Sequence, residues 1–138
     1  MLADRAAPAN AAGVVKADAY GTGAKQAGRA LARAGCMRFY VAWAEEGVAL
    51  RYAIGPAQQI AVFHGPSADN IDLIRSAGLS PVLNTLEQVR FWVELGADRP
   101  RATMALDTGM NRLGLSPSDW AAAADLTKDA KLEYVMSH

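Results

Sequence analysis

The residues that could do chemistry begin near the N-terminus, in the stretch VVKADAYG at residues 14–21. A short apolar run from Ala11 to Val15 predicts a buried strand, which would place Lys16 at its C-terminal end. A lysine amine held against apolar surroundings can lose its proton and attack a carbonyl carbon. Tyr20 follows across a predicted turn. The same spacing also fits a structural interpretation, in which Lys16 extends from the strand end into solvent and Tyr20 packs a loop.

A second stretch of this kind is LDTGMNRLG at residues 106–114, which follows another predicted strand. It contains two glycines, and it carries Asp107 and Arg112 in one loop. A loop with glycines lets the backbone approach a small ligand closely, and an arginine can bind a carboxylate through two parallel hydrogen bonds. An Asp-Gly turn with a solvated arginine is the structural alternative for these residues.

The elements that must position these residues alternate regularly between strand and helix. Each predicted strand is a nearly continuous apolar run, and glycines or capping residues bound most of the helices. Strands are predicted at residues 11–15, 37–42, 59–63, 79–83, 101–106 and 132–136, and helices at residues 23–34, 45–53, 67–77, 85–95 and 116–127. Strands of this composition are buried on both faces, so the pattern predicts an α/β fold with a parallel sheet covered by helices.

Two architectures fit six such units, namely an open doubly wound sheet and part of a (β/α)8 barrel. A complete barrel usually takes about 250 residues, so the 138 residues of this chain would form an incomplete one. Length alone therefore favours the open sheet. In either architecture functional groups gather at the C-terminal ends of the strands. The residues at or next to these ends are Lys16, Trp43, His64, Asn84, Asp107 and His138. A role for His64 in the turn before Gly65 is the simpler interpretation, and His138 could simply belong to a frayed chain end.

Composition narrows the functional class. The chain is 51% hydrophobic and 20% charged with a formal net charge of +0, which is typical of a single globular domain. No basic block indicates a nucleic-acid partner, and no apolar run reaches the roughly 18 residues of a membrane helix. Cys36 is the only cysteine, which fits a reducing compartment. Residues 1–9 lack the apolar core of a signal peptide, so a cytoplasmic location is expected.

Three motifs resemble one known family. Residues 14–23 (VVKADAYGTG) closely resemble the pyridoxal-phosphate attachment motif of bacterial alanine racemases. The loop at residues 106–114 resembles the second signature of that family, and residues 135–138 (VMSH) resemble its next strand end. The motifs occur in the family order with βα units between them, and the resemblance covers essentially the whole chain. It implies an incomplete TIM-type barrel of about six βα units out of eight, as a partial domain over residues 1–138 without the family's C-terminal β domain.

The resemblance also implies roles around pyridoxal 5′-phosphate. Lys16 would hold the cofactor as an internal aldimine and act as the base on the D-alanine face. Tyr20 would lie near the cofactor's phosphate, and His138 would lie against its pyridine ring. Arg112 would lie beside the phenolic oxygen of the cofactor and the substrate carboxylate, with a backbone contact to that carboxylate from Met110. Lys16 and Arg112 would be the catalytic residues in the interconversion of L- and D-alanine, and no metal is implied.

Several departures from the family limit this expectation. Thr22 stands where the family usually has a histidine, and Ala105 stands where many members have a carbamylated lysine that supports the arginine. The last two barrel strands, the arginine that contacts the pyridine nitrogen and the partner subunit's tyrosine, which is the opposing base, are also missing from these residues. We therefore expect a homodimer for the complete enzyme and weak or no racemase activity for this chain alone.

Two other classes remain open at this point. One is a non-catalytic pyridoxal-phosphate-binding protein of the single-barrel type, although the lysine motif of that group lacks the Ala-Asp-Ala-Tyr-Gly continuation found after Lys16. The other is a partial gene product without a function. Cofactor binding without turnover in a complete protein would favour the first class.

Overall fold

A computed structural model describes residues 5–130 and 132–138 of the chain. Six parallel strands form one sheet, and each strand pairs with its neighbours in chain order. The strands are β1 (Gly13–Val14), β2 (Arg38–Val41), β3 (Gln59–Val62), β4 (Ser80–Leu83), β5 (Ala102–Ala105) and β6 (Leu132–Met136). This order leaves β1 and β6 as the two edges of the sheet.

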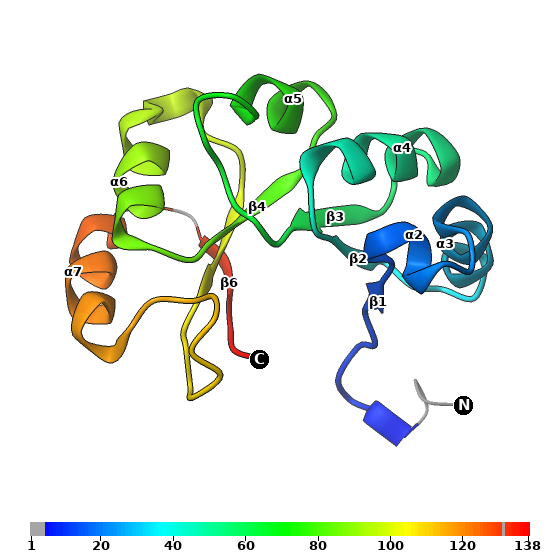
Figure 1. Cartoon of the computed structure of the whole chain (residues 1–138), viewed down its shortest axis with the longest axis horizontal. Coiled ribbons are helices and arrows are strands. Elements are labelled where there is room, and N and C mark those ends of the chain that lie inside the picture. The colour runs from blue at the N-terminus through cyan, green and yellow to red at the C-terminus, as the bar shows by residue number, and fades with distance from the viewer. Residues whose placement is uncertain (1–4, 131) are drawn as a thin grey trace.

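The helices lie along one side of this sheet. Figure 1 shows them as an arc outside the curved sheet, from α3 on the right to α7 on the left, with both termini on the open side of the arc. They are α3 (Ala24–Arg33), α4 (Ala44–Ile54), α5 (Ile71–Ser76), α6 (Leu86–Glu94) and α7 (Pro117–Thr127), with the short α2 (Lys16–Tyr20) and the 3-10 helix η1 (Gly96–Asp98). A doubly wound sheet would reverse its strand order at a switch point. The strand order of this sheet does not reverse. The fold is therefore the incomplete βα barrel that the resemblance implied, and the doubly wound sheet is excluded.

Helix starts follow the local sequence. Ser116 caps α7 by accepting a hydrogen bond from the N–H of Asp119, and Thr85 caps α6 by accepting one from Gln88. The start predicted for α5 at residue 67 was wrong, because the Asn70 side chain accepts a hydrogen bond from the Ser67 N–H and donates one to the Gly65 carbonyl. This side-chain pairing forms a turn, and the helix begins only at Ile71.

The core is divided between the two faces of the sheet. On the outer face, Phe39, Val41 and Ile60 are fully buried in a cluster with side chains of the covering helices. The alternate residues point to the inner, concave face, because successive side chains of a strand point to opposite faces. There Ala61 packs in a small cluster with the rings of Tyr40 and Phe63. The concave face is thus partly aromatic near the C-terminal ends of β2 and β3.

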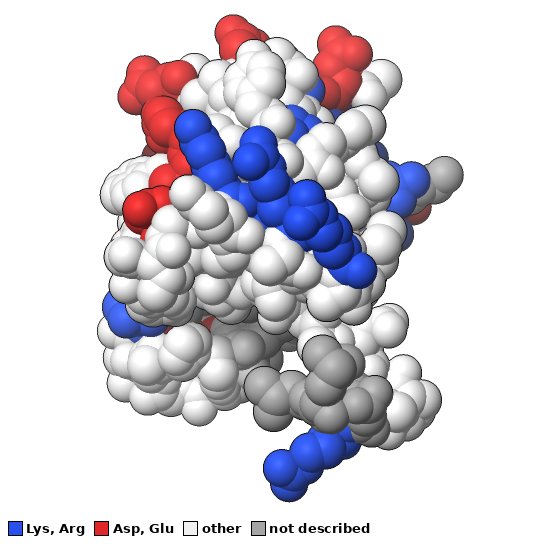
Figure 2. Space-filling model, turned by 90° about the vertical axis from the view of Figure 1, so that its right-hand side faces the viewer, with Lys and Arg blue, Asp and Glu red and all other residues white. Residues whose placement is uncertain are grey.

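Charged side chains are unevenly spread over the outer surface. Helix α3 carries Lys25, Arg29 and Arg33 at four-residue spacing, which places them on one face of the helix. Figure 2 shows a row of basic side chains on that side of the molecule. Among the described residues, no helix has the length and apolar character needed to cross a membrane.

Candidate functional site

Lys16 stands where β1 ends. The last bond of the β1 ladder joins the Val15 N–H to the Tyr40 carbonyl at 2.9 Å, and the Val15 side chain is buried. The half-buried Lys16 then directs its Nζ over the ring of Phe63, 5.6 Å from the centroid. Phe63 in turn stacks on Tyr40 with centroids 5.0 Å apart. The amine therefore lies above an aromatic surface at the C-terminal ends of the strands. The sequence predicted the position of Lys16 at a strand end, but not the aromatic rings beneath it.

The chain leaves Lys16 in an unusual conformation. The four residues Ala17 to Tyr20, which make up most of α2, all have left-handed backbone angles, with φ between 49° and 57°. This conformation costs about 1–2 kcal/mol for each residue that has a side chain. Two side chains hold the turn, because Asp18 accepts a hydrogen bond from the Ala24 N–H at 2.7 Å and Thr22 donates one to the Ala19 carbonyl at 2.6 Å. The sequence predicted an ordinary turn here. Only Asp18 indicated a left-handed backbone, because aspartate tolerates left-handed backbone angles better than most residues.

Sequence reasoning missed one further residue next to Lys16. The Glu46 carboxylate accepts hydrogen bonds from the Ala17 N–H at 2.8 Å, the Ala42 N–H at 2.8 Å and the Trp43 N–H at 3.3 Å. Its position in the first turn of α4 after Trp43 is that of a helix-capping glutamate, which was the available signal. The bond to Ala17 could not be foreseen from that signal.

Residues 106–114, the second stretch with candidate site residues, form a loop around Asp107. Its Oδ1 accepts hydrogen bonds from the N–H groups of Gly109 at 2.9 Å and Asn111 at 3.1 Å. These bonds from Gly109 and Asn111 lower the pKa of the Asp107 carboxyl below its usual value. At the other end of the loop, a Cβ on Gly114 would lie 2.7 Å from the Asp107 backbone nitrogen. Asp107 therefore shapes the loop that carries Met110 and Arg112.

The remaining predicted site residues are exposed at the same end of the sheet. Tyr20 is 66% exposed and Met110 is 50% exposed. Arg112 lies in the loop after β5, and His138 lies two residues beyond β6; both are exposed. Because β1 and β6 are the edge strands, Lys16 and His138 stand at opposite edges of the sheet. The structure brings Lys16 against Phe63, and it places the other four residues around the strand ends without burying them.

His64 does more than form the predicted turn. Its ring stacks on Trp43 with centroids 3.6 Å apart, and its Nδ1 lies 3.0 Å from the Ala42 carbonyl. Asn84 is buried and donates to the Phe63 carbonyl at 2.7 Å. These two side chains tie the ends of β2, β3 and β4 together, so their role in the described structure is to hold the strand ends.

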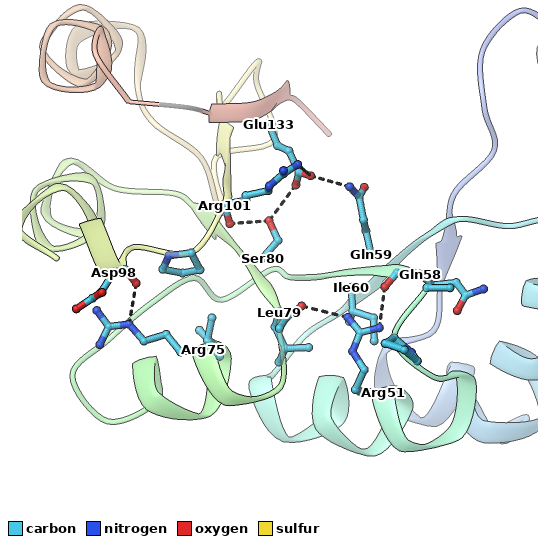
Figure 3. A pocket seen from close by; sticks show the side chains of 15 residues that line it. Arg51, Gln58, Gln59, Ile60, Arg75, Leu79, Ser80, Asp98, Arg101 and Glu133 are labelled. Atoms are coloured by element: carbon cyan, nitrogen blue, oxygen red, sulfur yellow. Dashed lines mark hydrogen bonds and ion pairs between the residues drawn. The ribbon is translucent and has the colours of Figure 1, made fainter. Parts of the chain in front are cut away.

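A cavity of about 710 Å³ lies at the opposite end of the sheet. Its lining includes Gln59, Ser80, Arg101 and Glu133, which stand at or near the starts of β3 to β6. Figure 3 shows these side chains turned toward one another. In βα barrels this end contributes stability, whereas active sites lie at the C-terminal end. The cavity is therefore separate from the lysine site.

These observations define a class of protein. The parallel strands pair in chain order, which is a feature of a βα-barrel domain. The lysine over an aromatic surface and the arginine-bearing loop lie at the C-terminal ends of the strands, where such domains have their sites. The sequence model of one family, described as "Alanine racemase, N-terminal domain", matches residues 1–138. The chain belongs to this family.

Individual relatives agree with this assignment. The chain is 48% identical over 135 residues to an alanine racemase of Jannaschia sp., covering 98% of this chain and 39% of that protein. It is similar to the crystal structure of the Bartonella henselae alanine racemase with covalently bound pyridoxal phosphate, with a TM-score of 0.90, 31% identity and coverage of 99% and 42%. The biosynthetic alanine racemase of Pseudomonas aeruginosa gives a TM-score of 0.86, 32% identity and coverage of 99% and 39%. The chain thus spans about two fifths of the length of these relatives.

Proposed function

We propose that this chain is the cofactor-binding barrel portion of a pyridoxal-phosphate-dependent alanine racemase, an isomerase that interconverts L- and D-alanine. The observation that carries the proposal is Lys16, whose amine lies over the Phe63 ring at a strand end. The Bartonella relative, whose structure contains covalently bound pyridoxal phosphate, supports the same assignment.

The side chains at the C-terminal ends of the strands fit the cofactor. Lys16 offers a primary amine to an aldehyde, and the stacked rings of Phe63 and Tyr40 offer an apolar flat surface beside it. The exposed guanidinium of Arg112 suits an anionic oxygen or a carboxylate. In this proposal Tyr20 binds near the phosphate and His138 lies against the pyridine ring. No part of the proposed reaction requires a metal.

The chain's own residues then have distinct tasks. When bound, the cofactor serves as an electron sink for the negative charge that develops on the substrate α-carbon. Lys16 holds the cofactor, and its Nζ takes or returns the α-proton on the D-alanine face. Arg112 orients the substrate carboxylate, and the backbone of Met110 contacts it. Racemisation requires a second acid-base group on the opposite face.

We place that second group outside residues 1–138, as a tyrosine of the family's C-terminal β domain supplied by a partner subunit. The complete enzyme is then a homodimer, and the present chain alone racemises alanine weakly or not at all. The single cysteine supports a reducing compartment, and on that ground we propose a cytoplasmic location.

Covalent labelling tests the proposed role of Lys16. The chain is incubated with pyridoxal phosphate, reduced with borohydride and digested, and the modified peptides are mapped. We expect the label on Lys16 and its loss in Lys16→Ala, with little label on the exposed Lys25 of α3. A folded sample without label on Lys16 would overturn the proposal.

A further inference from the structure

One carboxylate joins the ends of β1 and β2. Glu46 Oε1 accepts the Ala17 N–H, the peptide bond next to Lys16, at 2.8 Å. Glu46 Oε2 accepts the Ala42 N–H at 2.8 Å and the Trp43 N–H at 3.3 Å. Hydrogen bonds to an ionised carboxylate are roughly twice as strong as those between neutral groups. The two oxygens of one side chain therefore link the peptide after Lys16 to the end of the neighbouring strand.

This link begins where the sheet stops supporting the lysine. The pairing of β1 with β2 covers only Gly13 and Val14, and its last bond reaches Val15. The left-handed turn starts at Ala17. Glu46 supplies a tertiary hydrogen bond at Ala17, where the strained turn begins after the last bond of the ladder.

The carboxylate itself is firmly anchored. Glu46 lies in the first turn of α4, a helix in which Ala44 and Leu50 are each only 1% exposed. Gly47 follows it directly and is packed so closely that an added Cβ would lie 2.8 Å from Leu79. Since α4 cannot shift without disturbing this packing, it forms a rigid frame for the Glu46 side chain.

We propose that Glu46 is a positioning residue that sets the direction in which Lys16 leaves the sheet; this inference rests on the proposed function of Lys16. The peptide bound by Glu46 fixes the backbone on the C-terminal side of Lys16, and a rotation there is amplified at the end of a four-carbon side chain. Reactive groups must be held within about 0.5 Å and 10–20° of the productive geometry. Glu46 acts on Lys16 through the backbone and does not need to touch the cofactor or the substrate.

The test measures the rate at which Lys16 reacts with pyridoxal phosphate before borohydride reduction, as a function of cofactor concentration and pH. Glu46→Gln keeps the size of the side chain but replaces one acceptor oxygen by an NH2 group, which cannot accept an N–H. We expect Glu46→Gln to slow labelling of Lys16 about 10- to 100-fold, the range that a misplacement of about 1 Å can cause. Labelling of Lys25 in the same sample is the internal reference and should not change.

Glu45→Gln is the matched control, because Glu45 is an exposed neighbour in the same helical turn. We expect it to label Lys16 at the wild-type rate. If Glu46→Gln does not fold, as judged by circular dichroism, Glu46→Asp replaces it. Its carboxylate is one methylene shorter, so it should lose the bond to Ala17 and label Lys16 more slowly.

The outcomes separate the two proposals. Equal labelling rates at Lys16 in the folded Glu46 variant and in wild type would overturn the positioning role and leave the proposed function intact. A loss of rate shared by Lys16 and Lys25 would also overturn it, because it would show that the substitution has no effect specific to Lys16. Absence of label on Lys16 in the wild-type chain would overturn the proposed function itself.

Discussion

The two ends of the sheet use their polar side chains differently. At the N-terminal ends of the strands, Arg38 donates to Gln59 at 2.8 Å and to Thr103 at 3.0 Å, and it forms an ion pair with Glu133 at 3.5 Å. At the C-terminal ends, Tyr20 and Arg112 are exposed and the backbone after Lys16 is strained. Groups that are already paired have little capacity left for a ligand, whereas exposed donors and an accessible amine retain it.

Arg51 extends the same contrast at the N-terminal end. Its guanidinium donates to the carbonyls of Gly55, Gln58, Ala77 and Gly78 at 2.7–3.1 Å. Burial lowers the pKa of Arg51, yet the group stays charged at neutral pH. One side chain thus joins the loops that lead into β3 and β4. Paired side chains therefore stabilise the N-terminal end, whereas the C-terminal end combines paired side chains such as Asn84 with the exposed Tyr20 and Arg112.

The largest effect on stability is expected at Glu133. Its carboxylate also accepts a hydrogen bond from Gln59 at 2.7 Å, and its side chain and that of Arg38 are each 12% exposed. Glu133→Ala should lower the free energy of unfolding by about 3–5 kcal/mol, because it removes the carboxylate that balances the charge of the largely buried Arg38. Urea denaturation measures this, and the exposed Glu94→Ala on α6 should stay within about 0.5 kcal/mol of wild type. Similar losses in both variants would contradict the contrast between the two ends.

An intermediate effect is expected in the loop after β5. Gly114 has φ 111° and no room for a Cβ beside the Asp107 backbone, whereas Gly109 has φ 127° and open space around it. Gly114→Ala should cost more than the roughly 1–2 kcal/mol of backbone strain expected for Gly109→Ala, because its Cβ also clashes with the chain. Thermal unfolding compares the two variants. Equal destabilisation would show that the close packing at Gly114 is unimportant.

Much of the architecture could be predicted from the sequence because it depends on local signals. Apolar runs located the six strands, and Ser116 and Thr85 located two helix starts by their capping chemistry. The left-handed turn was missed because Ala-Asp-Ala-Tyr carries almost no signal for it. The partners of Glu46 and Arg38 were missed because the Ala17 bond spans 29 positions and the Thr103 bond spans 65. Such pairings depend on tertiary packing, which a local pattern does not contain.

The smallest effect concerns the pH dependence of the Asp107 loop. Since the folded-state pKa of Asp107 is lowered, its contribution to stability is fully present above the unfolded-state pKa of about 4 and is lost as pH falls through the folded-state pKa. Asp107→Asn should therefore reduce the loss of stability between neutral pH and acid. Denaturation curves across that range check this, and an unchanged pH profile would contradict the role of the carboxylate.

The most direct test of the proposed role of Lys16 follows the α-proton of alanine. The chain is incubated with pyridoxal phosphate in heavy water, and deuterium at the α-carbon of D-alanine and of L-alanine is measured separately. In the proposed mechanism Lys16 serves the D-alanine face, so we expect exchange of D-alanine to exceed that of L-alanine and of free cofactor, with little racemisation and with the excess lost in Lys16→Ala. Exchange that is equal for both enantiomers, or unchanged in Lys16→Ala, would contradict the account.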